Sequence, residues 1–287
     1  MKEYTRIVEK ILNDGVRKSN RTGIDTFMIS GMMFEHDMSK GFPLLTSKFV
    51  PLALVASELE FFIKGITDKE WLKERKNHIW DEWCSPLFVS YGHDEETQRR
   101  MMEERDLGPI YGFQWRQFGA GYESFDTRIP GGVDQLQRLV DMLKTNPDDR
   151  RMIVSAWNPM DLDKMALPPC HYSFQVTTSD GKLNLMWNQR SVDVALGLPF
   201  NIASYGLLLS LLAKEAGLEE GRLVGFLGDT HIYENHVAGL KKQLTHEFYD
   251  LPTISTPEFD SIFTWTYTDT QLKDYRHHPA IRFDIAV

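Results

Sequence analysis

The stretch YSFQVTTSDGKLNLMW, residues 172–187, contains two strand-like runs separated by a turn sequence. The runs 172–178 and 183–187 flank Ser-Asp-Gly-Lys at 179–182, which is typical of a tight hairpin. A largely apolar run over 202–218 follows and predicts a buried helix. This mixed order of strands and helix favours an α+β fold.

Segments on both sides of the hairpin extend this mixture. Sequence patterns predict helices over 4–12, 51–64, 133–144 and 236–245, and strands over 26–34, 152–157 and 223–227. No repeat, low-complexity segment or linker divides the chain. We therefore expect a single domain over residues 1–287, with a charged, exposed helical insertion at about 85–105.

The composition limits the classes of function. With 42% hydrophobic and 25% charged residues, the 287-residue chain is of ordinary globular composition and long enough for a sizeable core. Its formal net charge of −9 argues against binding to nucleic acid or to an anionic membrane. The most apolar stretch, 202–218, contains Lys214 and Glu215 and is too short and too polar to span a bilayer.

Cysteine usage bears on the cellular compartment. The sequence has only Cys84 and Cys170, which lie far apart, so a disulfide framework is excluded. The first residues contain no apolar core of a secretory signal. We therefore expect a reducing, cytoplasmic setting.

Cys170 is a candidate nucleophile. In ALPPCH, residues 166–171, two prolines fix the backbone just before the thiol. A thiolate needs nearby cations, and the candidates are Arg150, Arg151 and Arg190. A buried structural cysteine is the commoner alternative. A papain-like pair with the next residue, a histidine, is disfavoured because adjacent side chains of a strand face opposite ways.

Three arginine groups are candidates for a phosphate site. Arg150 and Arg151 follow an Asn-Pro-Asp-Asp run, Arg190 precedes Ser191, and Arg21 lies in a polar turn. Guanidinium forks suit phosphate oxygens, and a serine hydroxyl adds a donor. Surface ion pairing is the alternative for any single group. Several such groups occur together with a cysteine and an apolar loop, and this favours a phosphate site over surface ion pairs.

The run ALGLPFN, residues 195–201, is apolar with one amide at its end. The Asn201 amide can recognise a heterocycle edge through one donor and one acceptor, or it can N-cap the next helix. The local sequence leaves both open. Further on, His231 and Tyr233 would share one face of a strand and both donate to a sugar hydroxyl. The spacing of His231 and His236 does not suit a metal site.

Aromatic residues gather in two segments. The run HIWDEW, residues 78–83, contains Trp80 and Trp83, and YGFQWR at 111–116 adds three more rings. Core packing is the ordinary role of such residues. A stacking surface for a ring-shaped cofactor is the alternative, and the sequence leaves both open.

Taken in order, these segments resemble the thymidylate synthase family over nearly the whole chain. The most specific matches are LPPCH (167–171), the run 189–205 and GDTHIY (228–233). The resemblance implies a large mixed β-sheet packed by helices, with one sheet face at a homodimer interface. It also implies reductive methylation of dUMP to dTMP, with 5,10-methylenetetrahydrofolate as the donor of carbon and hydride.

The resemblance further implies residue roles. Cys170 would attack C6 of dUMP, and the other residues of the chemistry would be Glu58, Tyr111, His171, Asp193 and Asn201. The nucleotide would be held by Arg21, Gln189, Arg190, Ser191, Asn201, His231 and Tyr233, with Arg150 and Arg151 donated by the partner subunit. The reduced folate would meet Lys48, Ile79, Trp80, Trp83, Leu167, Asp193, Leu196, Gly197, Phe200, Ala286 and Val287. No metal is expected.

Two other functions are weighed against this one. Nucleotide hydroxymethylases share the fold and the covalent adduct, but water captures the methylene group; Trp80, which would shield that group, favours hydride transfer. Cytosine-specific relatives carry Asp at the position of Asn201. A non-catalytic nucleotide-binding protein would be favoured by loss of Cys170, Arg190 or Glu58, and all three are present.

Several positions depart from the usual family pattern. These are Phe49, Glu60, Asn188, the Ile-Thr-Asp run at 66–68 and the Arg-Phe-Asp run at 282–284. None is assigned to the chemistry. They concern contacts of the folate tail and closure of the site.

Overall fold

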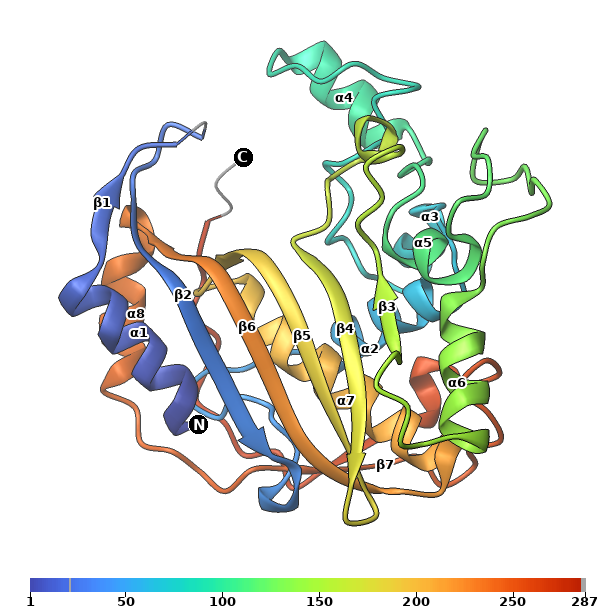
Figure 1. Ribbon diagram of the computed structural model, residues 1–287. Coiled ribbons are helices and arrows are strands. Elements are labelled where there is room, and N and C mark those ends of the chain that lie inside the picture. Colours follow the sequence, from blue (N-terminus) through green and yellow to red (C-terminus); the bar gives the residue numbers. More distant parts are fainter. Residues whose placement is uncertain (21, 285–287) are drawn as a thin grey trace.

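The computed structural model describes residues 1–20 and 22–284, and its centre is a mixed six-stranded sheet in the order β1-β2-β6-β5-β4-β3 (Figure 1). The strands are β1 (Val16–Lys18), β2 (Thr26–Asp37), β3 (Ile153–Ser155), β4 (His171–Ser179), β5 (Lys182–Asp193) and β6 (Glu219–Tyr233). A separate pair is formed by β7 (Thr253–Ser255) and β8 (Gln271–Lys273). The expected α+β class with a large mixed sheet is confirmed.

The helices are distributed along the whole chain. They are α1 (Lys2–Asp14), α2 (Leu52–Ile63), α3 (Glu70–Lys73), α4 (Glu95–Glu103), α5 (Tyr111–Gln117), α6 (Gln135–Thr145), α7 (Gly197–Ala216) and α8 (Val237–Leu244). Short 3-10 turns lie at Met38–Lys40, Leu162–Lys164, Glu234–His236 and Tyr267–Asp269. Within the described residues, no helix has the combined length and apolar character that crossing a bilayer requires.

The hairpin of β4 and β5 forms as the sequence predicts. Asp180 and Gly181 form its turn with φ of 51° and 75°, a left-handed pair that aspartate and glycine tolerate. Both strands are longer than predicted, and β5 continues to Asp193. Its last residues are polar and line a cavity, so they lack the apolar character that marks a strand in sequence.

A parallel pair lies beside this hairpin. β5 and β6 run in the same direction, with Ser191 opposite Asp229 and Asp193 opposite His231. Such a pair needs a long crossover, which α7 supplies. The carboxyl ends of both strands therefore meet at one edge of the sheet, and their polar side chains are brought together there.

Helix α7 begins earlier than expected. It starts at Gly197 rather than near Ile202. It ends at Ala216 and is followed by Gly217, whose left-handed φ of 67° is typical of a residue that stops a helix. Pro199 lies in the first turn, where a missing backbone N–H costs no helical hydrogen bond. Asn201 is thus inside the helix, so the alternative that it N-caps this helix is wrong.

The sheet has a covered face and an open face. Helices α2 and α7 lie behind it (Figure 1), and the buried rings of Trp187 and Tyr205 stack there with centroids 5.3 Å apart. On the other face, Met33 and Phe226 are paired neighbours of β2 and β6 and are 44% and 46% exposed. Ile153 of β3 is 52% exposed. A strand face with this much exposed apolar surface is suited to a protein interface.

Candidate active site

A cavity of about 1040 Å³ opens at the sheet edge where β5 and β6 end. Eighteen of the residues singled out from the sequence line it: Glu58, Ile79, Trp80, Trp83, Tyr111, Leu167, Cys170, His171, Gln189, Arg190, Ser191, Asp193, Leu196, Gly197, Phe200, Asn201, His231 and Tyr233. They come from α2, α5, the strands β4 to β6, the start of α7 and two loops. The fold therefore gathers residues from most of the chain around one space.

Other residues singled out from the sequence do not line this cavity. Arg21, Ala286 and Val287 lie outside the described residues. Arg150 and Arg151 are exposed and lie away from the cavity, and Arg151 forms an ion pair with Asp149.

Lys48 also lies off the cavity. Its buried ammonium donates to the carbonyl of Ala195 at 2.6 Å, and the ring of Phe283 lies 4.9 Å from the nitrogen. Burial lowers the pKa of Lys48 to about 8. This amine therefore supports the loop between β5 and α7 from behind.

The backbone around Cys170 is held from two sides. Its N–H donates to the Tyr111 hydroxyl at 2.8 Å, and its carbonyl accepts from the backbone N–H of Arg190 at 2.8 Å. The Arg190 guanidinium donates to the carbonyls of Pro168 and Pro169 at 2.7 and 2.9 Å. Because a guanidinium has five N–H groups, these two contacts leave others of the same fork for an anion. The Cys170 backbone is therefore fixed, and a permanent positive charge is bonded to the two prolines that precede it.

Glu58 is the acid–base candidate of the same cavity. Its carboxyl accepts a 2.8 Å hydrogen bond from the indole nitrogen of Trp80. Removal from water raises the pKa of Glu58 to about 7, against the opposing effect of the indole bond. A carboxyl that titrates near neutral pH can both donate and accept a proton during a reaction.

His171 lies between two tyrosines. Its Nδ1 is 2.9 Å from the Tyr205 hydroxyl, and its ring lies against that of Tyr111 with centroids 4.5 Å apart. Burial lowers the pKa of His171 to about 3, so the imidazole is neutral at physiological pH. The pKa of Tyr111 is raised well above its ordinary value by burial, so its hydroxyl keeps its proton. His171 and the Tyr111 hydroxyl can therefore position a proton or a water molecule without carrying a charge.

The orientation of the Asn201 amide follows from a chain of three residues. The Trp187 indole can only donate, and it donates to Oε1 of Gln189 at 3.1 Å. The Nε2 of Gln189 must then face Asn201, and it donates to Oδ1 at 2.9 Å. Asn201 therefore turns its NH₂ group to any ligand, which suits an acceptor such as a carbonyl oxygen.

Hydrogen bonds also fix the ends of β5 and β6. Asp193 accepts the backbone N–H groups of Ala195 and Leu196 at 2.9 and 3.1 Å. His231 pairs through Nδ1 with Asp229 at 2.9 Å, which leaves its Nε2 edge for a ligand. Tyr233 packs edge-on against His231 with ring centroids 5.2 Å apart.

Some residues of the cavity were not singled out from the sequence. They are Lys18, Asn20, Thr22, Thr26, Tyr91, Gly92, His93, Met165, Ala166, Pro168 and Asp229. Lys18 forms an ion pair with Asp229 at 2.9 Å, a contact between β1 and β6 that only the sheet order reveals. Tyr91 and His93 belong to the charged stretch near 85–105, where nothing in the local sequence indicates a binding surface.

The described residues contain no group of three or more His, Cys, Asp or Glu side chains that could hold a metal ion.

The protein-family model described as thymidylate synthase matches residues 2–287. The chain is also 43% identical, over 286 residues, to the bifunctional dihydrofolate reductase-thymidylate synthase of Paramecium tetraurelia. That match covers 99% of this chain and 61% of the relative, so the chain spans about three-fifths of the relative's length.

Proposed function

Since the chain belongs to the thymidylate synthase family, we propose that it methylates dUMP to dTMP with 5,10-methylenetetrahydrofolate as co-substrate. One observation carries this proposal. The cavity has the Cys170 thiol, the outward NH₂ group of Asn201 and the Trp80–Glu58 pair on its walls. Its volume of about 1040 Å³ is at the top of the range for a cavity that holds one small ligand. A cavity that holds two substrates at once needs a volume of this size.

In this proposal Cys170 starts the reaction. Its sulfur adds to C6 of the pyrimidine, and the electron pair of the C5–C6 bond makes C5 nucleophilic. C5 then bonds to the one-carbon unit of the folate. Loss of the C5 proton breaks the bond between that carbon and the folate nitrogen, which leaves an exocyclic methylene group on C5 and frees tetrahydrofolate. Hydride from this tetrahydrofolate adds to the methylene carbon as the thiolate is eliminated from C6, which releases dTMP and dihydrofolate. The covalent adduct divides one difficult carbon alkylation into easier steps.

The remaining residues bind, orient and move protons. Arg190, Ser191 and Arg21 would bind the 5′-phosphate, and Asn201, fixed by Gln189, would donate to the O4 carbonyl of uracil. His231 and Tyr233 would meet the 3′-hydroxyl. Glu58, Tyr111 and His171 would relay protons at the base, which agrees with the pKa of about 7 for Glu58 and the neutral His171.

The folate would occupy the apolar part of the cavity. Its walls there are Ile79, Trp80, Trp83, Leu167, Leu196, Gly197 and Phe200, with Asp193 as the polar group for the pterin. Ala286 and Val287 would complete this end of the site, and Lys48 would support it from behind the loop between β5 and α7. A dry, apolar wall favours hydride transfer over capture of the one-carbon unit by water.

A homodimer is part of the proposal. The open sheet face, with Met33, Phe226 and Ile153 exposed, supports an interface there. Arg150 and Arg151, which lie away from their own cavity, would then reach the phosphate bound by the partner subunit.

The test is a product analysis. The protein is incubated with dUMP and methylenetetrahydrofolate, and the products are identified by mass. Thymidylate together with dihydrofolate is the expected result. Hydroxymethyl-dUMP with tetrahydrofolate would instead assign the chain as a hydroxymethylase, and recovery of unchanged dUMP would overturn the proposal.

A further inference from the structure

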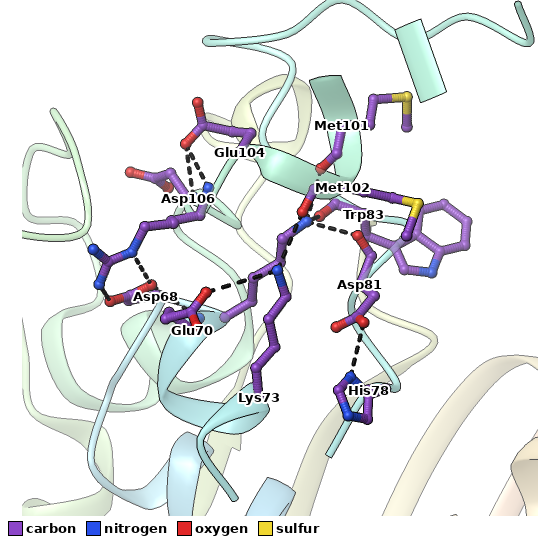
Figure 2. Close-up of polar contacts among 12 residues, drawn as sticks. Asp68, Glu70, Lys73, His78, Asp81, Trp83, Met101, Met102, Glu104 and Asp106 are labelled. Atoms are coloured by element: carbon purple, nitrogen blue, oxygen red, sulfur yellow. Dashed lines mark hydrogen bonds and ion pairs between the residues drawn. The ribbon is translucent and has the colours of Figure 1, made fainter. Parts of the chain in front are cut away.

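Lys69 is a buried ammonium whose three donors are all used. It is 1% exposed, and its Nζ lies 2.7 Å from each of three backbone carbonyls, those of Asp81, Trp83 and Met101 (Figure 2). A lysine ammonium has three N–H groups, so the set is complete. Such a group is costly to bury unless each donor is satisfied, so the three carbonyls must keep their positions around it.

These carbonyls belong to two different segments. Asp81 and Trp83 lie in the loop 78–83, which supplies Trp80 and Trp83 to the cavity. Met101 lies in the last turn of α4, where helix carbonyls lack helical partners and the dipole favours a cation. The Lys69 side chain therefore joins the cavity loop to the stretch that carries α4.

The stretch over residues 85–105, here called the α4 segment, forms part of the cavity wall. Tyr91, Gly92 and His93 line the same cavity as Trp83. The ring of Tyr91 lies near that of Trp83 with centroids 6.3 Å apart. The Tyr91 hydroxyl donates toward the carbonyls of Cys84, at 3.0 Å, and Ala166. The segment is thus tied both to the tryptophan loop and to the run that leads to Cys170.

The root of the α4 segment, here meaning its last residues 104–105, is also held in place. Arg105 forms an ion pair with Asp68, and its carbonyl accepts the backbone N–H of Lys69 at 2.9 Å. Glu104 accepts the backbone N–H groups of Arg105 and Asp106 at 2.8 and 2.9 Å (Figure 2). Both the root and the helix end are therefore fixed on the residues around Lys69.

We propose that the α4 segment is a wall of the folate half of the cavity and that Lys69 is the residue that positions it. The inference rests on the proposed function, because it concerns the co-substrate of that reaction. Tyr91 and Trp83 present ring surface to a planar, aromatic ligand such as the reduced folate. The nucleotide half is built from the ends of β5 and β6 and does not depend on Lys69.

The test compares Lys69→Met with Lys73→Met in the full chain. Lys73 lies one turn further along and donates to the carbonyl of Met102 at 3.2 Å, but it contacts neither the tryptophan loop nor the cavity. Steady-state KM is measured separately for methylenetetrahydrofolate and for dUMP. We expect Lys69→Met to raise the folate KM at least about tenfold and to change the dUMP KM less than about twofold. Lys73→Met should leave both near their wild-type values.

An unchanged folate KM in Lys69→Met, or an equal rise in both KM values, would overturn the inference. If Lys69→Met does not fold, Tyr91→Ala decides the question by the same two measurements, because this side chain is 45% exposed and its loss spares the core. The wild-type protein is assayed first. If it forms no dTMP, the proposed function fails by itself, and the dissociation constants for dUMP and for the folate then replace KM as the readout for Lys69.

Discussion

The indole nitrogen of Trp80 lies 2.8 Å from a carboxyl oxygen of Glu58. The residue expected to shield the one-carbon unit is thus bonded to the residue expected to move protons. The indole N–H stabilises the ionised carboxyl, whereas burial favours the neutral one, and burial has the larger effect. Shielding and proton transfer are therefore coupled through one hydrogen bond.

Replacing Trp80 should move the pH dependence of turnover. In Trp80→Phe the carboxyl loses its donor, so the pKa of Glu58 should rise above its value of about 7, by about one pH unit. The measurement is kcat between pH 5.5 and 9. Trp83→Phe is the matched control, because the carboxyl of Glu58 accepts its bond from the Trp80 indole and not from Trp83. The midpoint of the pH dependence of kcat should be the same in Trp83→Phe as in the wild type. A midpoint that stays in place in Trp80→Phe would exclude this coupling.

Glu58 should also make stability depend on pH. Its pKa is raised from 4.5 in the unfolded chain to about 7 in the folded chain, so the folded state holds a proton that the unfolded state releases. The contribution is complete below about pH 4.5 and is lost as the pH rises through 7. From pH 5 to pH 8, Glu58→Gln should gain about 2 kcal/mol of unfolding free energy relative to wild type. Urea unfolding of both proteins at the two pH values measures this difference, and a constant difference would contradict the raised pKa.

The two cysteines should behave differently. Cys170→Ser should lower kcat at least about 10⁴-fold while dUMP still binds, because a hydroxyl is a far weaker nucleophile than a thiolate. Cys84 is buried and its pKa is raised to about 11, so its thiol stays protonated. Cys84→Ala should keep turnover within about twofold of wild type. Single-turnover assays and equilibrium dUMP binding test both variants, and a fully active Cys170→Ser would remove the sulfur from the mechanism.

Asn201→Asp should change the preferred base. The carboxylate would accept from the amino group of cytosine and repel the O4 carbonyl of uracil. The ratio of kcat/KM for dUMP over dCMP should then fall at least about 100-fold. Asn188→Asp is the control, because Asn188 bonds to Ser173 on the open sheet face, away from the cavity. If the ratio were the same in Asn201→Asp and in wild type, the amide would have no part in recognising the base.

Mixed dimers should show whether arginines cross the interface. Arg151→Ala and Cys170→Ser should each be inactive alone. After joint refolding, a hybrid dimer has one complete site, made of Cys170 from one chain and Arg151 from the other. Random pairing should then restore about a quarter of wild-type activity. Two inactive variants that stay inactive when mixed would show that Arg151 acts within its own subunit, and an active Arg151→Ala would show that the activity does not need this side chain.

Elements whose residues show a clear local preference could be predicted from the sequence. The hairpin turn needs a left-handed backbone at Asp180 and Gly181, and an Asp-Gly pair is typical of such a turn. The ends of β5 and β6 were missed because cavity-lining polar residues interrupt the alternation of a strand. Tyr91 was missed for another reason: its place at the cavity depends on carbonyls far away in sequence, such as that of Ala166.

The departures from the family pattern are satisfied locally. Glu60 is buried but accepts from the Lys64 ammonium at 2.5 Å and from the backbone N–H of Tyr267 at 2.8 Å. Phe49 packs against His277, with ring centroids 4.7 Å apart. Neither residue lines the cavity. Glu60 and Phe49 thus each have a structural partner that a single sequence does not reveal.

The parallel pairing of β5 with β6 has a consequence for how the protein folds. The 20-residue helix α7 connects β5 to β6 along the chain. Ser191 and Asp229 therefore become neighbours only after α7 has packed against the sheet and returned the chain to it. The Tyr4 hydroxyl likewise reaches the carbonyl of Val194 across 190 positions. Contacts of such long range slow folding, because the loop between them must close first. During synthesis, a growing chain that ends before β6 therefore lacks the strand that carries Asp229, His231 and Tyr233, so the wall of the cavity is complete only once this last long strand is in place.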